Sequence, residues 1–223
     1  MNADRKNRGT SLVETLIYGA VLSLAFSTVC GILIAGMSSF HLGADAVDIQ
    51  EQALRGVTAL ERGLRESNFI STQVNGSGES KGVIFISPRN LQNQFDYDAG
   101  EGCLFWNKLV CMYVAPHPVT GIPALIRKEV AISRTSLNVP IAELTATHQS
   151  VTAFVSDAAL KPRYVAGCLD DLRCSFAKDE VNQQIHVALA FRKNGQNAAH
   201  RIMLDLRNQS FPGILGIRTR NGR

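Results

Sequence analysis

The residues best suited to catalysis or metal binding are scattered along this chain and form no known catalytic pattern. The five histidines are His41, His117, His148, His186 and His200. None of them belongs to a His-Glu-x-x-His motif, which would place two zinc ligands on one helix face, and there is no Gly-x-Ser-x-Gly elbow for a serine nucleophile. We therefore expect a protein that is not an enzyme and that holds no metal or cofactor.

Four of the five cysteines form two close pairs, Cys103/Cys111 and Cys168/Cys174, whereas Cys30 lies in a long apolar run. Separations of eight and six residues differ from the Cys-x-x-Cys spacing of zinc sites. Paired cysteines suit an oxidising compartment, and four of them allow three pairings. We favour Cys103–Cys111 and Cys168–Cys174, each across a short hairpin, where a disulfide would contribute about 2–3 kcal/mol.

An acidic segment contains Asp96, Asp98 and Glu101 within six residues. Its density of oxygen ligands is that of a weak calcium loop, but the full twelve-residue ligand pattern is missing. A solvated acidic turn is the favoured interpretation, and calcium binding stays open as the alternative.

One carboxylate, Glu14, lies at the start of a long apolar segment. From Thr15 to Ala44 the chain has no Asp, Glu, Lys, Arg or Pro, which is a run of thirty residues. About 20 such residues suffice to cross a bilayer as a helix. A carboxylate costs roughly 2.5–3.5 kcal/mol at mid-span and less near an end, so Glu14 is a candidate functional residue.

Three ordinary explanations of this N-terminus fit poorly. The apolar run is about twice the roughly 7–15 residues of a secretory signal, although Ala44-Asp45-Ala46 imitates its cleavage site. A lipoprotein signal would need small residues directly before Cys30, where the chain has Ser27-Thr28-Val29. A plain membrane anchor explains the length and the basic head, which would stay cytoplasmic, but it does not explain Glu14.

The segment Arg5-Lys6-Asn7-Arg8-Gly9, followed by Thr10-Ser11-Leu12-Val13-Glu14-Thr15-Leu16-Ile17, resembles the class III signal of type IV prepilins. The resemblance implies that a prepilin peptidase cuts between Gly9 and Thr10 and methylates the amine of Thr10. Glu14 would then be the fifth residue of the mature chain. The family commonly has Phe or Met where this chain has Thr10.

The resemblance also implies that Glu14 takes part in subunit assembly. Cleavage creates a positive amine at Thr10, and in a filament the carboxylate can pair with the amine of a neighbouring subunit. The implied partners are the prepilin peptidase, an inner-membrane assembly platform, the major pilin, other minor pilins and, in some systems, a tip adhesin. No nucleic-acid partner is expected, because the net charge of +4 is mild and unclustered.

The sequence predicts four segments. Residues 1–9 would be the leader, 10–43 the transmembrane half of one long helix, 44–70 its amphipathic half, and 71–223 a periplasmic β-rich globular domain. The amphipathic half carries an apolar stripe at helical spacing: Ile49, Ala53, Val57, Leu60 and Leu64. The glycines of the membrane half, at 19, 31, 36 and 43, either are ordinary membrane-helix glycines or let helices approach closely.

Short strands are predicted after Gly82. The candidates are Val83–Ile86, Cys103–Trp106, Leu109–Ala115, Ala124–Ile132, Val151–Val155, Leu172–Phe176, Ile185–Phe191 and Arg201–Leu206. Asn194-Gly195 favours a hairpin between the last two. The expected fold class is α+β, with the long N-terminal helix packed on a mostly antiparallel sheet.

The order of these elements resembles the larger minor pilins and pseudopilins of the PilW and GspJ groups. The similarity rests on Leu125-Ile126-Arg127-Lys128, Leu169–Phe176 and Leu206-Arg207-Asn208. It implies a PilW-like minor pilin that primes pilus assembly at the inner membrane and stays near the tip. A GspJ-like minor pseudopilin of a type II secretion system, or a membrane-anchored periplasmic binding domain that never polymerises, are the alternatives.

Overall fold

The structure is a computed structural model. It describes residues 11–76, 80–90, 92–97, 104–193 and 196–205, the last of these ranges for the backbone only. The chain divides into two units, Met1–Ala46 and Val47–Arg223, which we describe separately. One helix, α1, runs from Leu12 to Arg65 and contributes to both units.

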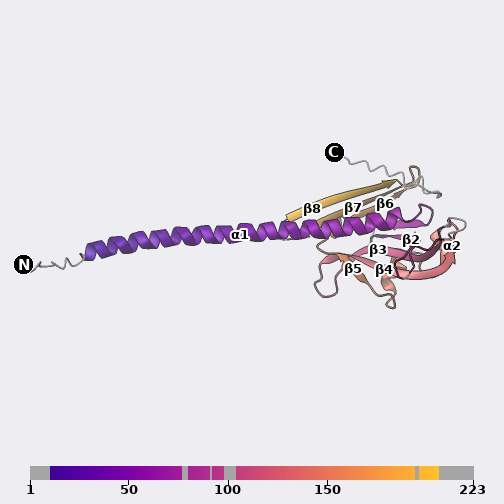
Figure 1. The fold of residues 1–223 in the computed structure, drawn as a ribbon, viewed down its shortest axis with the longest axis horizontal. Helices are drawn as coiled ribbons and strands as arrows, with labels where there is room; N and C mark the ends of the chain where they lie inside the picture. Colours follow the sequence, from indigo (N-terminus) through magenta and orange to yellow (C-terminus); the bar gives the residue numbers. More distant parts are fainter. Residues whose placement is uncertain (1–10, 77–79, 91, 98–103, 194–195, 206–223) are drawn as a thin grey trace, which may run out of the picture. The chain divides into compact units, whose positions relative to one another are not determined.

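The elements that follow α1 belong to the second unit (Figure 1). They are, in chain order, β1 (Thr72–Asn75), β2 (Gly82–Ser87), β3 (Trp106–Pro116), β4 (Pro123–Thr135), α2 (Ile141–Leu144), α3 (Val151–Ser156), β5 (Arg163–Ala166), the 3₁₀ turn η1 (Asp171–Arg173), β6 (Ser175–Asp179), β7 (Gln184–Lys193) and β8 (Gln196–Asp205).

All strand pairs of the two sheets are antiparallel. The larger sheet has the order β1-β2-β3-β4-β5, and the smaller has the order β6-β7-β8. In the smaller sheet Lys193 lies opposite Gln196, so β7 and β8 form the hairpin that Asn194-Gly195 predicts. The α+β fold class is therefore confirmed.

The second half of α1 packs between the two sheets (Figure 1). Its stripe of Ile49, Ala53, Leu60 and Leu64 is buried, as the apolar spacing predicts. The helix contacts the apolar side chains on one face of the larger sheet, including Phe85. It also contacts the side chains of β7, in the smaller sheet, that point toward it. The inward residues of β7 are Ile185, Val187, Leu189 and Phe191.

The other face of the larger sheet is also covered. Ile84 and Ile86 of β2 point away from α1 and pack with Ile141 and Phe154 of the segment that joins β4 to β5. Every residue of β2 is consequently buried, with alternate side chains in two separate cores. A strand buried on both faces is typically a near-continuous apolar run, and Val83–Ile86 of β2 is such a run.

Lys128 of β4 ties the covering segment to the sheet. Its buried Nζ donates to the carbonyls of Phe154 at 2.8 Å, Val155 at 3.1 Å and Asp157 at 2.8 Å. These carbonyls end α3, where the helix leaves oxygens without intrahelical partners and where the dipole favours a cation. Lys128 therefore caps α3 from the neighbouring strand.

Three strand predictions are wrong. Cys103–Trp106 is not a separate strand, because Phe105 lies in no strand and Trp106 is the first residue of β3, while Cys103 lies outside the described residues. Val151–Val155 is part of helix α3, because the hydroxyl of Ser150 accepts from the N–H of Ala153 and starts a helical turn. In Leu172–Phe176, Leu172 lies in the 3₁₀ turn η1 and only the end of the segment lies in β6. Two short strands, β1 and β5, were not expected.

Candidate functional site: the N-terminal turns of α1

The first turn of α1 is closed by a capping box built on Ser11 and Glu14. The backbone N–H of Ser11 donates to Oε2 of Glu14 at 3.2 Å, and the N–H of Val13 lies 3.4 Å from Oγ of Ser11. The two side chains thus satisfy two N–H groups that the helix start leaves unpaired. The negative carboxylate also lies at the positive end of the helix dipole.

After this turn α1 presents large apolar side chains in all directions. From Leu12 to Leu42 they are 49–79% exposed within the structure. By length and composition α1 is able to cross a membrane. An exposed apolar surface of this extent marks a segment that lipid or other protein covers, so the first half of α1 is compatible with a membrane anchor.

Four hydroxyl groups in this apolar stretch bond to their own helix. Oγ of Ser23 donates to the carbonyl of Ala20 at 2.9 Å, and Oγ of Ser27 to that of Ser23 at 2.9 Å. Thr28 and Ser38 bond in the same way to carbonyls three residues before them. These four hydroxyls therefore need no water, which makes them compatible with a lipid or protein interior.

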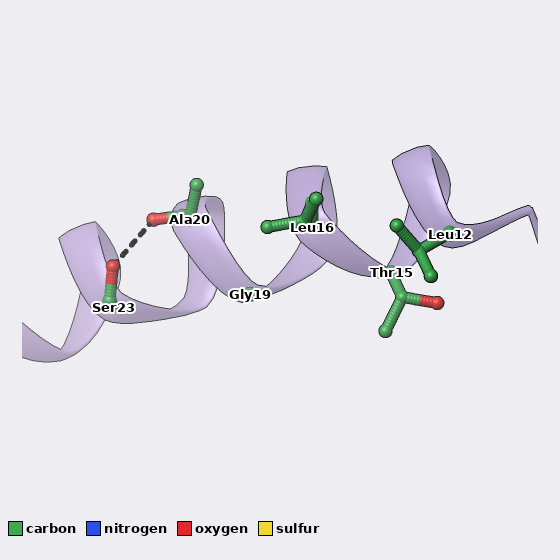
Figure 2. A pocket seen from close by; sticks show the side chains of 6 residues that line it. All are labelled: Leu12, Thr15, Leu16, Gly19, Ala20 and Ser23. Atoms are coloured by element: carbon green, nitrogen blue, oxygen red, sulfur yellow. Dashed lines mark hydrogen bonds between the residues drawn. The ribbon is translucent and has the colours of Figure 1, made fainter.

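Small residues open a shallow hollow on one face near the N-terminus of α1. Figure 2 shows Gly19, Ala20 and Ser23 on this face, with Leu12, Thr15 and Leu16 along the preceding turns. An added Cβ at Gly19 would meet nothing within 4 Å. Small residues such as these allow another helix backbone to approach closely.

The structure describes only part of the predicted assembly site. Glu14 stands in the first turn of α1, whereas the predicted cleavage and methylation positions, Gly9 and Thr10, lie outside the described residues. The carboxylate reaches the N–H of Ser11, which is one residue after the predicted new N-terminus.

No disulfide occurs among the described cysteines, so the predicted pairs Cys103–Cys111 and Cys168–Cys174 have no support from the structure. Cys111 and Cys174 carry free thiols, and Cys103 lies outside the described residues. The hairpin expected around residues 106–108 does not exist, because Trp106–Pro116 is one continuous strand. The thiol of Cys174 instead approaches the carbonyl of Ala190 at 3.8 Å.

Both thiols are buried in apolar surroundings. Cys111 faces the core that contains Ile84 and Phe154. Burial raises the pKa of Cys111 and also that of Cys174, since a thiolate is poorly solvated there. These side chains act as small core residues rather than as nucleophiles.

Asp96 is the one carboxylate of the acidic segment that the structure describes, and it forms an ion pair. Arg134 donates to both oxygens of Asp96 at 3.0 and 2.9 Å, and Asn107 donates to Oδ2 at 2.9 Å. The hydrogen bonds from Arg134 hold the pKa of Asp96 below its usual value. Asp98 and Glu101 lie outside the described residues, and no cluster of metal ligands occurs within the described ranges.

Sequence reasoning missed two functional side chains. Ser11-x-x-Glu14 has the spacing of a capping box, so the motif could have been found by the rule that finds helix starts. Lys128 carried no such signal, because its role depends on where α3 ends beside β4.

Comparison with protein-family models, with curated proteins and with solved structures gave no match to this chain.

Proposed function

We propose that this chain is a type IV pilin-like subunit, and specifically a minor pilin that primes pilus assembly and stays near the tip. The observation that carries the proposal is the carboxylate of Glu14, held in the first turn of an exposed apolar helix. Cleavage after Gly9 would create an amine one residue before Ser11, and therefore beside this carboxylate or that of a neighbour.

The charge of Glu14 supplies a reason for the helix to leave the bilayer. In lipid the carboxylate has its own helix N–H groups as partners but no opposite charge. In a filament it gains the cationic N-terminus of an adjacent subunit, in an interior of low dielectric where such a pair is strong. The first half of α1 would exchange lipid for other helices at the same time, so its apolar surface stays covered.

The globular unit supports a subunit of low copy number. Its sheet is buried on both faces, so the head has a complete core without neighbouring copies. The covering segment with α2 and α3 adds bulk on the side of the sheet opposite α1. A repeating subunit must pack such bulk at every step of the filament, whereas a priming subunit does so once. A minor pseudopilin of a secretion system would have the same requirements.

A plain, non-polymerising membrane anchor is the second candidate, and the capping box favours it. A capping box stabilises the start of a helix whether or not the helix later assembles. In that case Glu14 would need no neighbour, and the leader would not be cut.

The mass of the mature N-terminus tests the proposal. The full chain is expressed in a host that has a prepilin peptidase, extracted in detergent and measured by mass spectrometry. We expect loss of residues 1–9 and one added methyl group on Thr10. An intact Met1, or cleavage near Ala46, would contradict the proposal.

A further inference from the structure

Two arginines lie directly opposite each other on β4 and β5. Arg127 pairs in register with Arg163, so both side chains leave the same face of the larger sheet. Residues opposite in an antiparallel pair have Cβ atoms about 5 Å apart, and like charges at this distance destabilise the pair. We call Arg127 and Arg163 the arginine pair.

Among the described side chains, Arg127 has one carboxylate partner, Glu129, and Glu129 also pairs with Lys108. Glu129 Oε1 lies 2.6 Å from Nε of Arg127, and Glu129 Oε2 accepts from Nζ of Lys108 at 2.8 Å. Burial raises the pKa of Glu129, but Lys108 and Arg127 together bring it below its usual value, so this carboxylate is charged. Glu129 is thus already shared by Lys108 and Arg127, and no described carboxylate forms an ion pair with Arg163.

The arginine pair also has unused hydrogen-bonding capacity. The buried Nε of Arg127 lies 2.6 Å from Oε1 of Glu129, and no hydrogen bond from the rest of its guanidinium is found among the described residues. The Arg127 side chain is 24% exposed, and Arg163 is exposed. Among the side chains that the structure describes, Arg163 has no ion-pair partner. Lys108, at 3% exposed, cannot reach an external group.

We propose that the arginine pair is a docking site for an acidic segment of a partner protein. A guanidinium is a planar fork that binds a carboxylate with two parallel hydrogen bonds, and two adjacent forks select an anion strongly. A single carboxylate between the exposed ends of the two guanidiniums would offset their repulsion and accept hydrogen bonds from both. This goes beyond the proposed function, since docking of this kind does not require polymerisation.

The position of Arg127 favours a protein carboxylate over a lipid or nucleic-acid phosphate. Arg127 is recessed on a strand face, so its partner must project as a side chain does, and the headgroup layer of a bilayer is too flat. A single-stranded nucleic acid needs a longer basic track with aromatic rings beside it. The ring of Tyr164 belongs to the residue after Arg163 and so points to the opposite face.

The test is the affinity of the full chain in detergent for a fluorescein-labelled hexaglutamate peptide, measured by fluorescence anisotropy. We expect Arg163→Glu to weaken binding at least tenfold. Arg192→Glu makes the same charge change at another exposed arginine, on β7, and should change binding less than twofold. Arg163→Ala is a second variant with no new charge, and an intermediate loss is expected.

A stability measurement separates docking from a structural role. In the free protein Arg163→Glu replaces a repulsive cross-strand pair by an attractive one, so the urea midpoint should rise while peptide binding falls. A lower midpoint together with lost binding would overturn the proposal, because the arginine would then be structural.

Two further outcomes would also overturn it. Equal loss of binding in Arg163→Glu and Arg192→Glu would mean that the peptide senses only net charge. Displacement of the peptide by glycerol 3-phosphate at concentrations where free glutamate fails would mean that the site prefers a lipid headgroup phosphate.

Discussion

The carboxylate of Glu14 accepts a hydrogen bond from the backbone N–H of Ser11, at 3.2 Å, in the first turn of α1. This contact gives the residue two separable properties. As a hydrogen-bond acceptor it caps the helix, and a neutral amide could do the same. As a negative charge it can attract a cation, which only a carboxylate can do. The proposed function depends on the second property.

Replacement of Lys128 by Met should destabilise the globular unit by about 2–3 kcal/mol. The aliphatic stem is kept, but three carbonyls at the end of α3 lose their donor. A buried unsatisfied group costs about 1–3 kcal/mol, and only Phe154 is fully buried, since Val155 and Asp157 are partly exposed and water can replace the donor there. The measurement is urea unfolding followed by the fluorescence of the single tryptophan, Trp106.

Lys161→Met is the matched control for this variant. Lys161 is exposed on the surface of the same unit, so its replacement should change the unfolding free energy by less than about 0.5 kcal/mol. If Lys128→Met were equally mild, Lys128 would not be the cap of α3.

Gly63→Ala should also destabilise the globular unit, by about 1–3 kcal/mol. An added Cβ would lie 2.5 Å from Cζ and 2.8 Å from Cε2 of Phe85, so the ring must move within a filled core. At Gly43 an added Cβ would meet nothing within 4 Å, and Gly43→Ala should leave the urea midpoint unchanged or raise it. Equal midpoints for the two variants would contradict the close packing of α1 on β2.

The pair of His148 and Asp157 predicts a dependence of stability on pH. Nε2 of His148 lies 2.9 Å from Oδ2 of Asp157, and this contact, followed by the N–H of Ala159, lowers the pKa of Asp157. A lowered folded-state pKa contributes stability above the unfolded value, about 3.9, and that stability is lost as pH falls through the folded-state pKa.

Asp157→Asn should therefore be less stable than the parent at pH 5, with the difference shrinking as the pH falls below about 4. Urea midpoints of both proteins between pH 5 and pH 2.5 give this difference directly. A difference that stays constant over this range would show that the charge of Asp157 contributes nothing to stability.

Cys111 should resist alkylation in the folded protein. Its thiol is buried and its pKa is raised, so the reactive thiolate is scarce and inaccessible. We expect iodoacetamide to label the Cys111 peptide at least a hundredfold more slowly in buffer than in urea. A mass deficit of about 2 Da for each cysteine pair in the unreduced protein would instead show that the disulfides form.

Much of the fold could be predicted because two hydrophobic periods are strong in this sequence. The step of three to four residues from Ile49 to Leu64 gave the buried face of α1, and the alternation of Ile185–Phe191 gave β7. Asn194-Gly195 predicted the hairpin that β7 and β8 form. These signals are local, so no knowledge of the tertiary structure was needed.

The failures come from features that only tertiary structure decides. Val151–Val155 has the β-branched composition of a strand, yet Ser150 at its start and Lys128 beside its end make it a helix. Strand β1 is polar and short and exists because it pairs with β2. The cysteine pairing failed because it assumed a turn inside what is one long strand, β3.

The central claim is that the charge of Glu14, rather than its capping hydrogen bond, drives assembly. Incorporation of the subunit into sheared, pelleted filaments measures this in Glu14→Gln and Ser11→Ala. Glutamine can still accept from the N–H of Ser11 but carries no charge, whereas Ser11→Ala removes the hydroxyl cap and keeps the charge. Membrane insertion and N-terminal cleavage are checked in both variants.

The account predicts that Glu14→Gln lowers incorporation at least tenfold while inserting and being cleaved normally, and that Ser11→Ala stays within about twofold of the parent. Normal incorporation of Glu14→Gln, or equal losses in the two variants, would contradict it and leave Glu14 as a helix cap.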